Sequence, residues 1–191
     1  MINEVPPLRF PILETKRLKL IEITHHHLES IFAILSIEEV TKYYGTDPFI
    51  LPAEATKLID MYHKNFLEKR GMRWAIKLKE NQKIIGTIGL NGLQMNNKRA
   101  EISYELHPAY WQNGFATEAL KEVLRFSFMH LELYRMGAVV YPQNTVSLHL
   151  LAKLGFVNEG LLRGYIFQNK QSHDAYVLSL LKQEWEKSQE E

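Results

Sequence analysis

The residues with the clearest chemical potential lie in one stretch, Trp111–Ala119, with the sequence WQNGFATEA. The stretch follows a predicted strand, Arg99–Leu106, and opens a run of apolar residues at helical spacing. A helix N-terminus carries unpaired N–H groups and a partial positive charge, so it binds anions without a basic side chain. Gly114 and Ala116 leave room for a phosphate beside the backbone. The local pattern leaves two interpretations open, a phosphate site or a helix start that contains a glycine.

The elements that must position this stretch can be predicted from hydrophobic spacing. Strands are expected at Arg17–Ile23, Met72–Leu78, Lys83–Leu90, Arg99–Leu106, Arg135–Val140, Phe156–Leu162 and Ala175–Leu181. Helices are expected after Thr24, after Pro52, from the stretch above to about His130, and from Asn144 to Gly155. Loops are expected at Val40–Leu51 and Gly164–Ser172. Hairpins followed by strand–helix units predict a mixed α/β fold whose sheet is largely antiparallel, flanked by helices.

The length of 191 residues predicts a single domain covering residues 1–191. Residues 1–12 are expected to form an extended lead-in, and residues 182–191 a polar C-terminal tail that frays. The net charge of +1 argues against a broad nucleic-acid surface. No apolar run reaches membrane-spanning length and no secretory h-region is present, so we expect a cytoplasmic protein that binds neither membrane nor nucleic acid.

Several kinds of enzyme are disfavoured by what the sequence lacks. Without cysteine there is no thiol nucleophile and no Cys-ligated zinc. The eight histidines include no His-Glu-x-x-His pair, so no metal is expected. The three consecutive histidines at positions 25–27 fit a solvated helix edge better than a metal site, because neighbouring helical side chains point in different directions. The sequence contains no Gly-x-x-x-x-Gly-Lys-Ser/Thr loop, which a nucleotide hydrolase of this kind would need.

Three motifs follow one another along the chain. They are Glu14–Leu20 (ETKRLKL), Tyr104–Ala119 (YELHPAYWQNGFATEA), and Asn144-x-x-Ser147 followed by Lys153–Phe156 (KLGF). Together they resemble the GNAT N-acetyltransferase superfamily, and within it the branch of the RimJ- and RimL-like ribosomal-protein N-terminal acetyltransferases. The resemblance covers residues 13–181 and implies the GNAT-like acyl-CoA N-acyltransferase fold. The resemblance is compatible with a homodimer and does not decide between a monomer and a dimer.

The resemblance implies acetyl-CoA as co-substrate. The backbone N–H groups that would hold its pyrophosphate belong to Gln112, Asn113, Gly114, Phe115, Ala116 and Thr117. The pantetheine arm would lie where the strand Arg99–Leu106 splays from the strand Arg135–Val140, and would pair with the backbone of Leu106 and His107. Asn144 and Ser147 belong to the second cofactor motif. Lys153 is a weaker candidate for a contact to the 3′-phosphate.

Acyl transfer to an amine requires a neutral amine, a donor for the developing oxyanion and a source of a proton for the leaving thiolate. The resemblance implies that a backbone N–H near Leu106, at a bulge in its strand, is the oxyanion donor. Many relatives use a tyrosine acid at the position of Leu151, so that role does not carry over to this chain. Ser147 is the substitute by resemblance, although a serine in the first helical turn often only caps the helix.

The general base is less well defined. Glu105 adjoins the proposed oxyanion site, and alternation places it on the face of Glu101 and Ser103, opposite Tyr104 and Leu106. Glu105 is therefore a candidate base or water-relay partner, or a solvated strand residue. His107 is a second candidate, but its place beside Pro108 at a strand end favours a structural role.

The acceptor is expected to be a primary amine. Deprotonating a lysine amine at pH 7 costs roughly 4–5 kcal/mol, against about 1–1.5 kcal/mol for an α-amine. A site without an evident strong base therefore favours a protein N-terminus, and a polyamine or antibiotic is the alternative. By resemblance, Val40–Phe49 and Gly164–Ser172 would line the acceptor side, where Tyr43, Tyr44, Glu38, Glu39 and Asp47 either hold a cationic amine or cover the core. A module that binds acetyl-CoA without turnover is the remaining rival.

Overall fold

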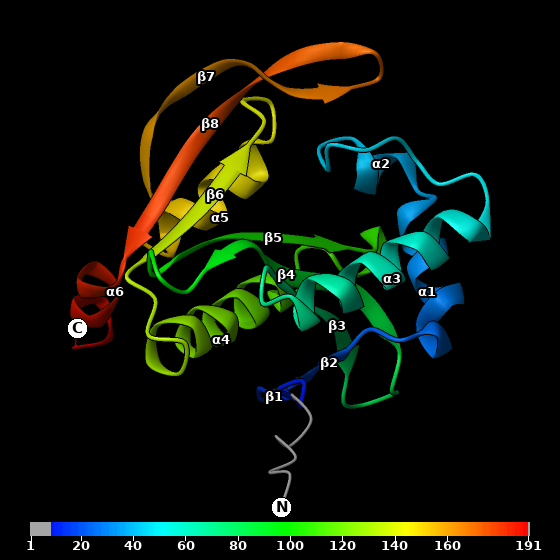
Figure 1. Cartoon of the computed structure of the whole chain (residues 1–191), viewed down its shortest axis with the longest axis horizontal. Helices are drawn as coiled ribbons and strands as arrows, with labels where there is room; N and C mark the ends of the chain where they lie inside the picture. The colour runs from blue at the N-terminus through cyan, green and yellow to red at the C-terminus, as the bar shows by residue number, and fades with distance from the viewer. Residues whose placement is uncertain (1–8, 191) are drawn as a thin grey trace, which may run out of the picture.

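An eight-stranded sheet forms the centre of the computed structural model, which describes residues 9–190. In spatial order the strands are β1 (Leu13–Glu14), β2 (Leu18–Glu22), β3 (Met72–Leu78), β4 (Ile84–Gln94), β5 (Arg99–Leu106), β6 (Arg135–Val140), β8 (Gln171–Leu181) and β7 (Val157–Gln168) (Figure 1). All neighbouring pairs are antiparallel except β5 and β6, which run parallel. The predicted mixed α/β class with a mostly antiparallel sheet is confirmed.

The parallel pair β5–β6 is short. It joins only Arg99–Glu101 to Arg135–Gly137, whereas the other edge of β5 stays paired with β4 as far as Leu106, opposite Gly86. From Ile102 onward β5 therefore has an edge that β6 does not fill. The two strands splay as the resemblance implied.

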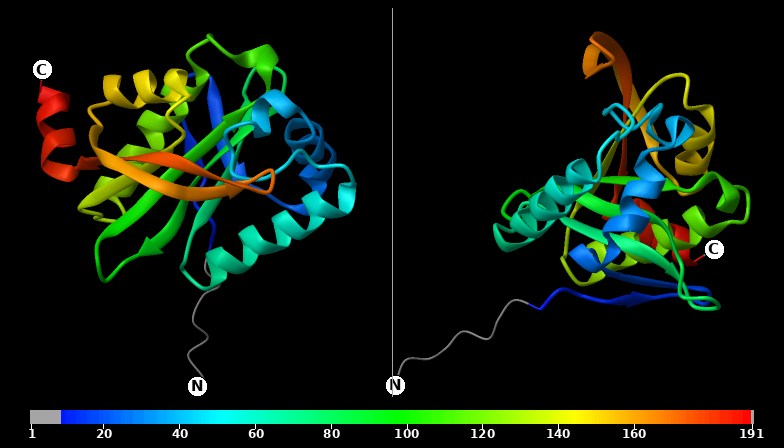
Figure 2. Two further views of the ribbon diagram at one scale, coloured as in Figure 1. Left: turned by 90° about the horizontal axis from the view of Figure 1, so that it is seen from above. Right: turned by 90° about the vertical axis from the view of Figure 1, so that its right-hand side faces the viewer.

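Helices cover both faces of the sheet. They are η1 (His25–His27), α1 (Leu28–Leu35), α2 (Glu38–Thr41), α3 (Pro52–Leu67), η2 (Pro108–Tyr110), α4 (Phe115–Met129), α5 (Thr145–Lys153) and α6 (Lys182–Glu190). Side chains of β3 alternate between two cores: Trp74 and Ile76 pack with α4, and Ala75 packs with α1 and α3. Two further views show α3 (cyan) and α4 (green to yellow) on different sides of the sheet (Figure 2). Within residues 9–190 no helix is long and apolar enough to cross a membrane.

Three predicted strands have the expected bounds: Met72–Leu78, Arg99–Leu106 and Arg135–Val140. The loop predicted at Gly164–Ser172 is wrong. Strands β7 and β8 continue through it as a hairpin, with Ile166 opposite His173, and turn only at Asn169 and Lys170, where φ is 53° and 58°. A register shift between Leu162 and Ile166 accommodates the extra residues, so this part of the chain forms a bulge within the hairpin rather than a loop.

The chain ends also differ from expectation. The fraying tail predicted at 182–191 is wrong for residues 182–190, which form helix α6, and Glu191 lies outside the described residues. Trp185 anchors the helix: it is 9% exposed, and its ring lies 5.4 Å from that of Phe128. Of the predicted lead-in 1–12, residues 1–8 lie outside the described part of the chain. The predicted loop Val40–Leu51 begins within helix α2.

Candidate active site

A pocket of about 410 Å³ lies where β5 parts from β6. Its wall includes Tyr104, Glu105 and Leu106 of β5. One end is lined by the start of α4 together with Asn144 and Ser147, and the other by Glu39, Val40, Tyr43 and Tyr44. The start of α4 packs with the core on one face of the sheet, whereas Val40 and Tyr44 pack with the core on the other. The pocket therefore connects the two faces, so two ligands can enter from opposite sides and meet beside β5.

The α4 end of the pocket is built from backbone amides. Gly114 is the N-cap of α4 with φ 76°, and no side chain caps the helix. Gln112 also has positive φ, 60°. Within residues 9–190, the N–H groups from Gln112 to Thr117 have no hydrogen-bond acceptor, and Glu118 is the first to bond, to Gly114 O. This arc of free donors at a helix N-terminus fits a phosphate group.

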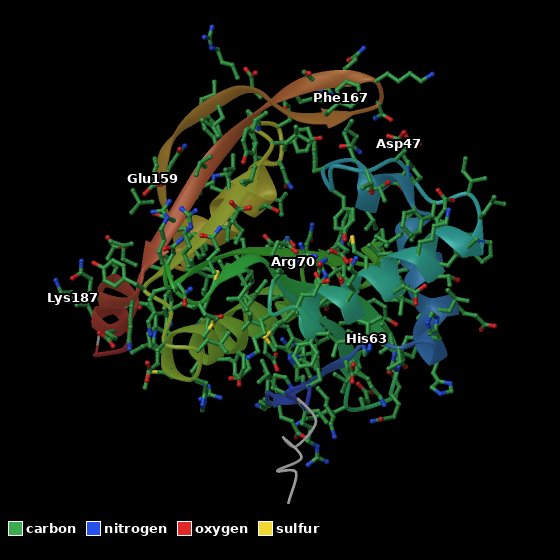
Figure 3. All side chains as sticks on the ribbon, in the orientation of Figure 1. Asp47, His63, Arg70, Glu159, Phe167 and Lys187 are labelled. Atoms are coloured by element: carbon green, nitrogen blue, oxygen red, sulfur yellow. The ribbon has the colours of Figure 1, made fainter. Side chains whose placement is uncertain are left out.

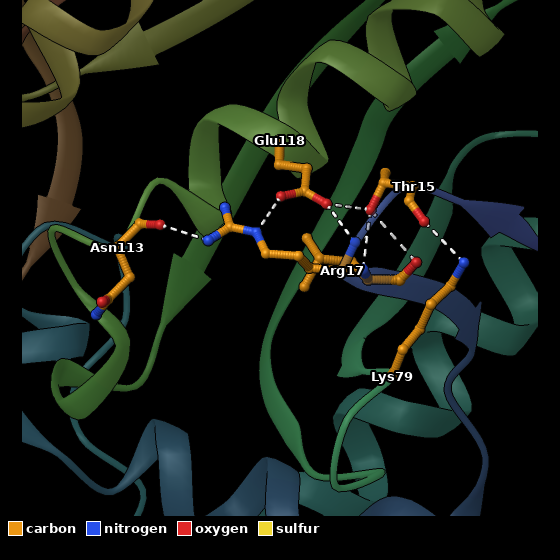
Figure 4. Close-up of polar contacts among 6 residues, drawn as sticks. Thr15, Arg17, Lys79, Asn113 and Glu118 are labelled. Atoms are coloured by element: carbon orange, nitrogen blue, oxygen red, sulfur yellow. Dashed lines mark hydrogen bonds and ion pairs between the residues drawn. The ribbon is translucent and has the colours of Figure 1, made fainter.

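A clamp from the turn between β1 and β2 holds this amide arc in place (Figure 4). The backbone N–H of Arg17 donates to Glu118 Oε1 (2.8 Å) and its Nε donates to Glu118 Oε2 (2.6 Å). Arg17 Nη1 donates to Asn113 O (3.0 Å), and the guanidinium lies 4.3 Å from the ring centroid of Phe115. Thr15 Oγ1 adds a third donor to Glu118 (2.5 Å). The motif at Glu14–Leu20 thus fixes the loop that the central motif supplies.

The clamp also tunes the charge of Glu118. Partial burial alone would raise the pKa of this carboxyl, but the hydrogen bonds from Thr15 and Arg17 outweigh burial and lower the pKa below its ordinary value. Glu118 therefore stays ionised. Since its charge pairs with Arg17, it does not repel an anion at the amides.

The end of β5 presents a backbone donor to the pocket. His107 N–H donates to Ile85 O (2.8 Å), in register with the Gly86–Leu106 pair. Because amides alternate in direction along a strand, the N–H of Leu106 points away from β4, toward the open edge. The bulge expected here is wrong: the register is continuous from Glu101 to Leu106 and shifts only between Asn91 and Gln94. The splay exposes this donor instead.

His107 is less suited to the predicted cofactor contact. Its N–H is bonded to Ile85 and its carbonyl accepts from Tyr110 N–H (3.0 Å). Its side chain accepts from Ala109 N–H (3.2 Å) and lines a separate cavity of about 380 Å³ beside α1. Lys153 is exposed at the end of α5 and is not among the residues that line the pocket at β5.

Glu105 is held in a buried ion pair with Arg73. Their side chains are 4% and 3% exposed. One carboxylate oxygen accepts from Arg73 Nη2 and the other from Thr87 Oγ1, while Arg73 Nε donates to Thr87 (2.7 Å) and its Nη1 to Ser103 Oγ (2.6 Å). Burial alone would lower the pKa of Arg73, but electrostatic interactions with Glu105, Tyr44 and Tyr62 and the hydrogen bond to Glu105 raise it, so the guanidinium stays charged. With both oxygens engaged, the geometry weighs against Glu105 as a free base, a role that stays a prediction.

The α5 motif contributes a cap and a hydroxyl. Asn144 Oδ1 accepts from Ser147 N–H (3.2 Å), which makes Asn144 the N-cap of α5. Ser147 lines the pocket beside Tyr104. Leu151, which stands where relatives carry the tyrosine acid, is buried in the core at 1% exposure.

Near the end of the pocket that Glu39 and Tyr43 line, which is the predicted acceptor side, a clasp joins two segments far apart in sequence. Gln168, at the tip of β7, donates from Nε2 to Thr41 O (2.9 Å) and Thr46 O (2.7 Å), and its Oε1 accepts from Tyr141 Oη (2.6 Å). Asn169 N–H donates to Asp47 Oδ1 (3.2 Å). Figure 3 shows Asp47 and Phe167 on these facing segments. Of the predicted acceptor-side residues, Glu39, Tyr43 and Tyr44 line the pocket, whereas Asp47 serves the clasp.

Sequence reasoning missed four residues that shape this site: Arg17, Arg73, Tyr104 and Gln168. A lone arginine inside the apolar strand MRWAIKL is a signal for Arg73, because a buried charge needs a partner. Arg17 lies inside a motif that indicated only a strand. For Gln168, at the end of a hairpin, no signal in the sequence marks the contact.

The fold and the pocket define a class of enzyme, and the comparison with known families agrees. Residues 17–157 match the family model described as "Acetyltransferase (GNAT) domain". The chain belongs to the GNAT acetyltransferase family and is an N-acetyltransferase.

Among individual relatives, the chain is 44% identical over 173 residues to YoaA of Bacillus subtilis, an uncharacterised N-acetyltransferase, covering 91% of this chain and 98% of the relative. It is 33% identical over 103 residues to YdaF of Bacillus subtilis, provisionally named a ribosomal N-acetyltransferase, covering 54% of this chain and 56% of the relative. In fold it is similar to spermidine N-acetyltransferase from Vibrio cholerae in complex with CoA and spermine, with a TM-score of 0.79 and 23% identity over 90% of this chain and 99% of that one.

Proposed function

We propose that the chain transfers the acetyl group of acetyl-CoA directly to a primary amine, preferably the α-amine at a protein N-terminus. The observation that carries the proposal is the continuous pocket beside β5, with free amides from Gln112 to Thr117 at one end and a mouth of side chains at the other. Bound acetyl-CoA supplies an activated acetyl group as a thioester. The amides of α4 bind its pyrophosphate and the N–H of Leu106 is directed to stabilise the carbonyl oxygen.

No residue of the pocket needs to carry the acetyl group. The chain contains no cysteine, and both ligands can reach the edge of β5 from their own face of the sheet. Direct attack by the amine then requires only that the amine be neutral when it arrives.

The preference for an α-amine follows from the free-energy cost of deprotonating the amine in a site that lacks a free base. The carboxylate of Glu105 already accepts from Arg73 and Thr87, so the pocket lacks a strong free base at that position. An α-amine loses its proton at pH 7 at a cost of about 1–1.5 kcal/mol, whereas a lysine-like amine costs roughly 4–5 kcal/mol. The 33% identity to YdaF, a provisional ribosomal N-acetyltransferase, supports the same class of acceptor.

A polyamine is the second candidate acceptor. The pocket mouth combines the carboxylate of Glu39 with the rings of Tyr43 and Tyr44, groups that attract a cationic chain. The similarity in fold to an enzyme whose structure contains spermine agrees with this choice.

An acceptor screen separates the two candidates. Release of thiol from acetyl-CoA would be measured with a panel of N-terminal peptides, spermidine, spermine and aminoglycosides at pH 7 to 9. We expect the highest kcat/KM with peptides. Turnover on polyamines alone would reject the α-amine, and no turnover with any amine would leave a protein that binds acetyl-CoA without transferring it.

A binding control comes first. Coenzyme A should raise the melting temperature of the protein because it binds the native state, and ATP at the same concentration should raise it less. An equal or larger shift with ATP would indicate a nucleotide site instead.

A further inference from the structure

Tyr104 has a hydroxyl group that the folded chain does not use. Among the side chains of residues 9–189, Tyr104 Oη is the buried polar atom without a hydrogen-bond partner. Buried polar groups are almost always paired, and an unpaired one destabilises the fold. Since Tyr104 lines the pocket, its partner can be an atom of a ligand that enters there.

The surroundings of this hydroxyl indicate which ligand atom it meets. Tyr104 and Leu106 lie on the same face of β5, and both belong to the segment that has parted from β6. Ser147, at the start of α5, lies close enough to Tyr104 to influence its hydroxyl. The pair does not have the geometry of a hydrogen bond, so Oη is left without a partner among the described residues. The backbone of Leu106 offers the donor for the carbonyl oxygen, so the two hydroxyls form a second set of donors.

We propose that Tyr104 Oη is a catalytic hydrogen-bond donor to the sulfur of the acetyl thioester, beside Ser147; this rests on the proposed function. The lone pair of the amine forms the new N–C bond, and the C–S bonding pair goes to the sulfur. The nitrogen gives its proton to solvent. Tyr104 keeps its own proton, and its hydrogen bond strengthens as negative charge gathers on the sulfur.

The acidity of the phenol is consistent with donation rather than proton transfer. Burial raises the pKa of Tyr104 above its ordinary value near 10, and the neighbouring Ser147 offsets only part of that rise. An ordinary thiol titrates near 8.5, so the phenol is the weaker acid. The hydroxyl therefore remains protonated throughout turnover and acts as a fixed donor.

The test is the Tyr104→Phe variant, which removes one oxygen atom. Without ligand its melting temperature should equal or exceed that of the wild type, because the lost hydroxyl had no partner. The rise in melting temperature on adding coenzyme A should be smaller, corresponding to a Kd about 3- to 10-fold weaker. With acetyl-CoA, kcat should fall at least about 10-fold while KM for the amine stays constant.

Tyr134→Phe is the matched control, since Tyr134 is 50% exposed and outside the pocket lining. It should change none of these quantities. A lower melting temperature of ligand-free Tyr104→Phe, with an undiminished response to coenzyme A, would show that the hydroxyl is structural and overturn the proposal.

A comparison that needs only the wild type keeps the idea testable if the variant does not fold. Coenzyme A should bind more tightly than an analogue with hydrogen in place of its thiol group, and equal affinity would overturn the role of Tyr104. If the wild type responds to coenzyme A but Tyr104→Phe responds equally, only this inference fails. If coenzyme A does not stabilise the wild type, the proposed function fails as well.

Discussion

The two ends of the pocket are built in different ways. The proposed cofactor end consists of backbone N–H groups from one contiguous segment, Gln112–Thr117, whose direction is set by left-handed residues and the start of α4. The proposed acceptor end consists of side chains from α2, from the turn after it and from β5, supported by Arg73 of β3 and Gln168 of β7. Its clasp joins Gln168 to Thr41 and Thr46, which are 127 and 122 residues away in sequence.

This difference predicts that the choice of amine can change more easily than the binding of the cofactor. Backbone amides bind a phosphate whatever the side chains are, so the cofactor end tolerates little change in conformation and much change in sequence. The acceptor end depends on side chains in surface segments, where substitutions alter shape and charge without disturbing the sheet. We therefore expect substitutions at the two ends to have different effects. Substitutions at the first end should change the binding of acetyl-CoA, and those at the second should change the use of the amine.

The largest effect is expected from Arg73, the buried partner of the pocket-lining residue Glu105. Arg73→Ala would leave the Glu105 carboxylate buried without its charge partner and should lower the free energy of unfolding by about 3–5 kcal/mol. Urea denaturation measures this. Replacing both charges, with Arg73→Met and Glu105→Leu, should lose clearly less, because no lone charge is then buried. Equal losses would contradict the ion-pair account.

The next effect concerns the cofactor end. Gly114→Ala places a side chain at φ 76°, which should cost about 1–2 kcal/mol of stability and turn the neighbouring amides, so that coenzyme A binds about 10- to 100-fold more weakly. Gly92→Ala is the control: Gly92 also has positive φ, 53°, but a Cβ there meets open space. Calorimetric titration should find full affinity in Gly92→Ala. Similar weakening in both variants would show that general destabilisation is the cause.

A smaller effect should follow from opening the clasp. Gln168→Leu removes the bonds to Thr41, Thr46 and Tyr141 and leaves their polar groups without this partner. We expect KM for the amine to rise about 3- to 10-fold while KM for acetyl-CoA stays constant. Gln171→Leu, an exposed change on the same hairpin, should do neither. Equal changes in both KM values would show that the two ends are not separate.

The smallest effect is a pH dependence confined to the cofactor end. The pKa of Glu118 is lowered in the folded protein, so its clamp on the amide arc is fully present above about pH 4.3 and is lost as pH falls toward the lowered value. Affinity for coenzyme A should decline a few-fold in this range, since exposed ion pairs contribute about 0–1 kcal/mol. The Glu118→Gln variant should bind coenzyme A weakly at every pH, and its affinity should not show this pH dependence. If the variant showed the same pH dependence as the wild type, a group other than Glu118 would be responsible for the loss of affinity.

The sequence predicted the strand, turn and helix of the proposed cofactor end because the information for these elements is local. A strand, a turn with Gly114, and a helix follow one another, and each residue acts through its own backbone. The strands β3, β5 and β6 were equally clear because their hydrophobic patterns are strong. The acceptor end was not predictable in this way: the Arg73–Glu105 pair joins different strands, and Gln168 meets its partners only after the whole sheet has formed.

The remaining errors have a similar origin. Helix α6 is polar except for Trp185, so only its contact with Phe128 shows that the tail is ordered. The sequence predicts two shorter strands and a loop in place of the hairpin β7–β8, because a bulge interrupts the alternation of apolar residues. The expected bulge in β5 was wrong since splaying from β6 already frees the amide of Leu106.

The short pairing of β5 with β6 also has a consequence for hydrogen exchange. Amides of Ser103 and Glu105 point into the ladder with β4, whereas those of Tyr104 and Leu106 point to the edge that β6 leaves open. In deuterated water the second pair should label quickly and the first slowly, although all four belong to one strand. An arm of substrate lying along that edge would act as a temporary neighbouring strand and slow the labelling of Tyr104 and Leu106 alone.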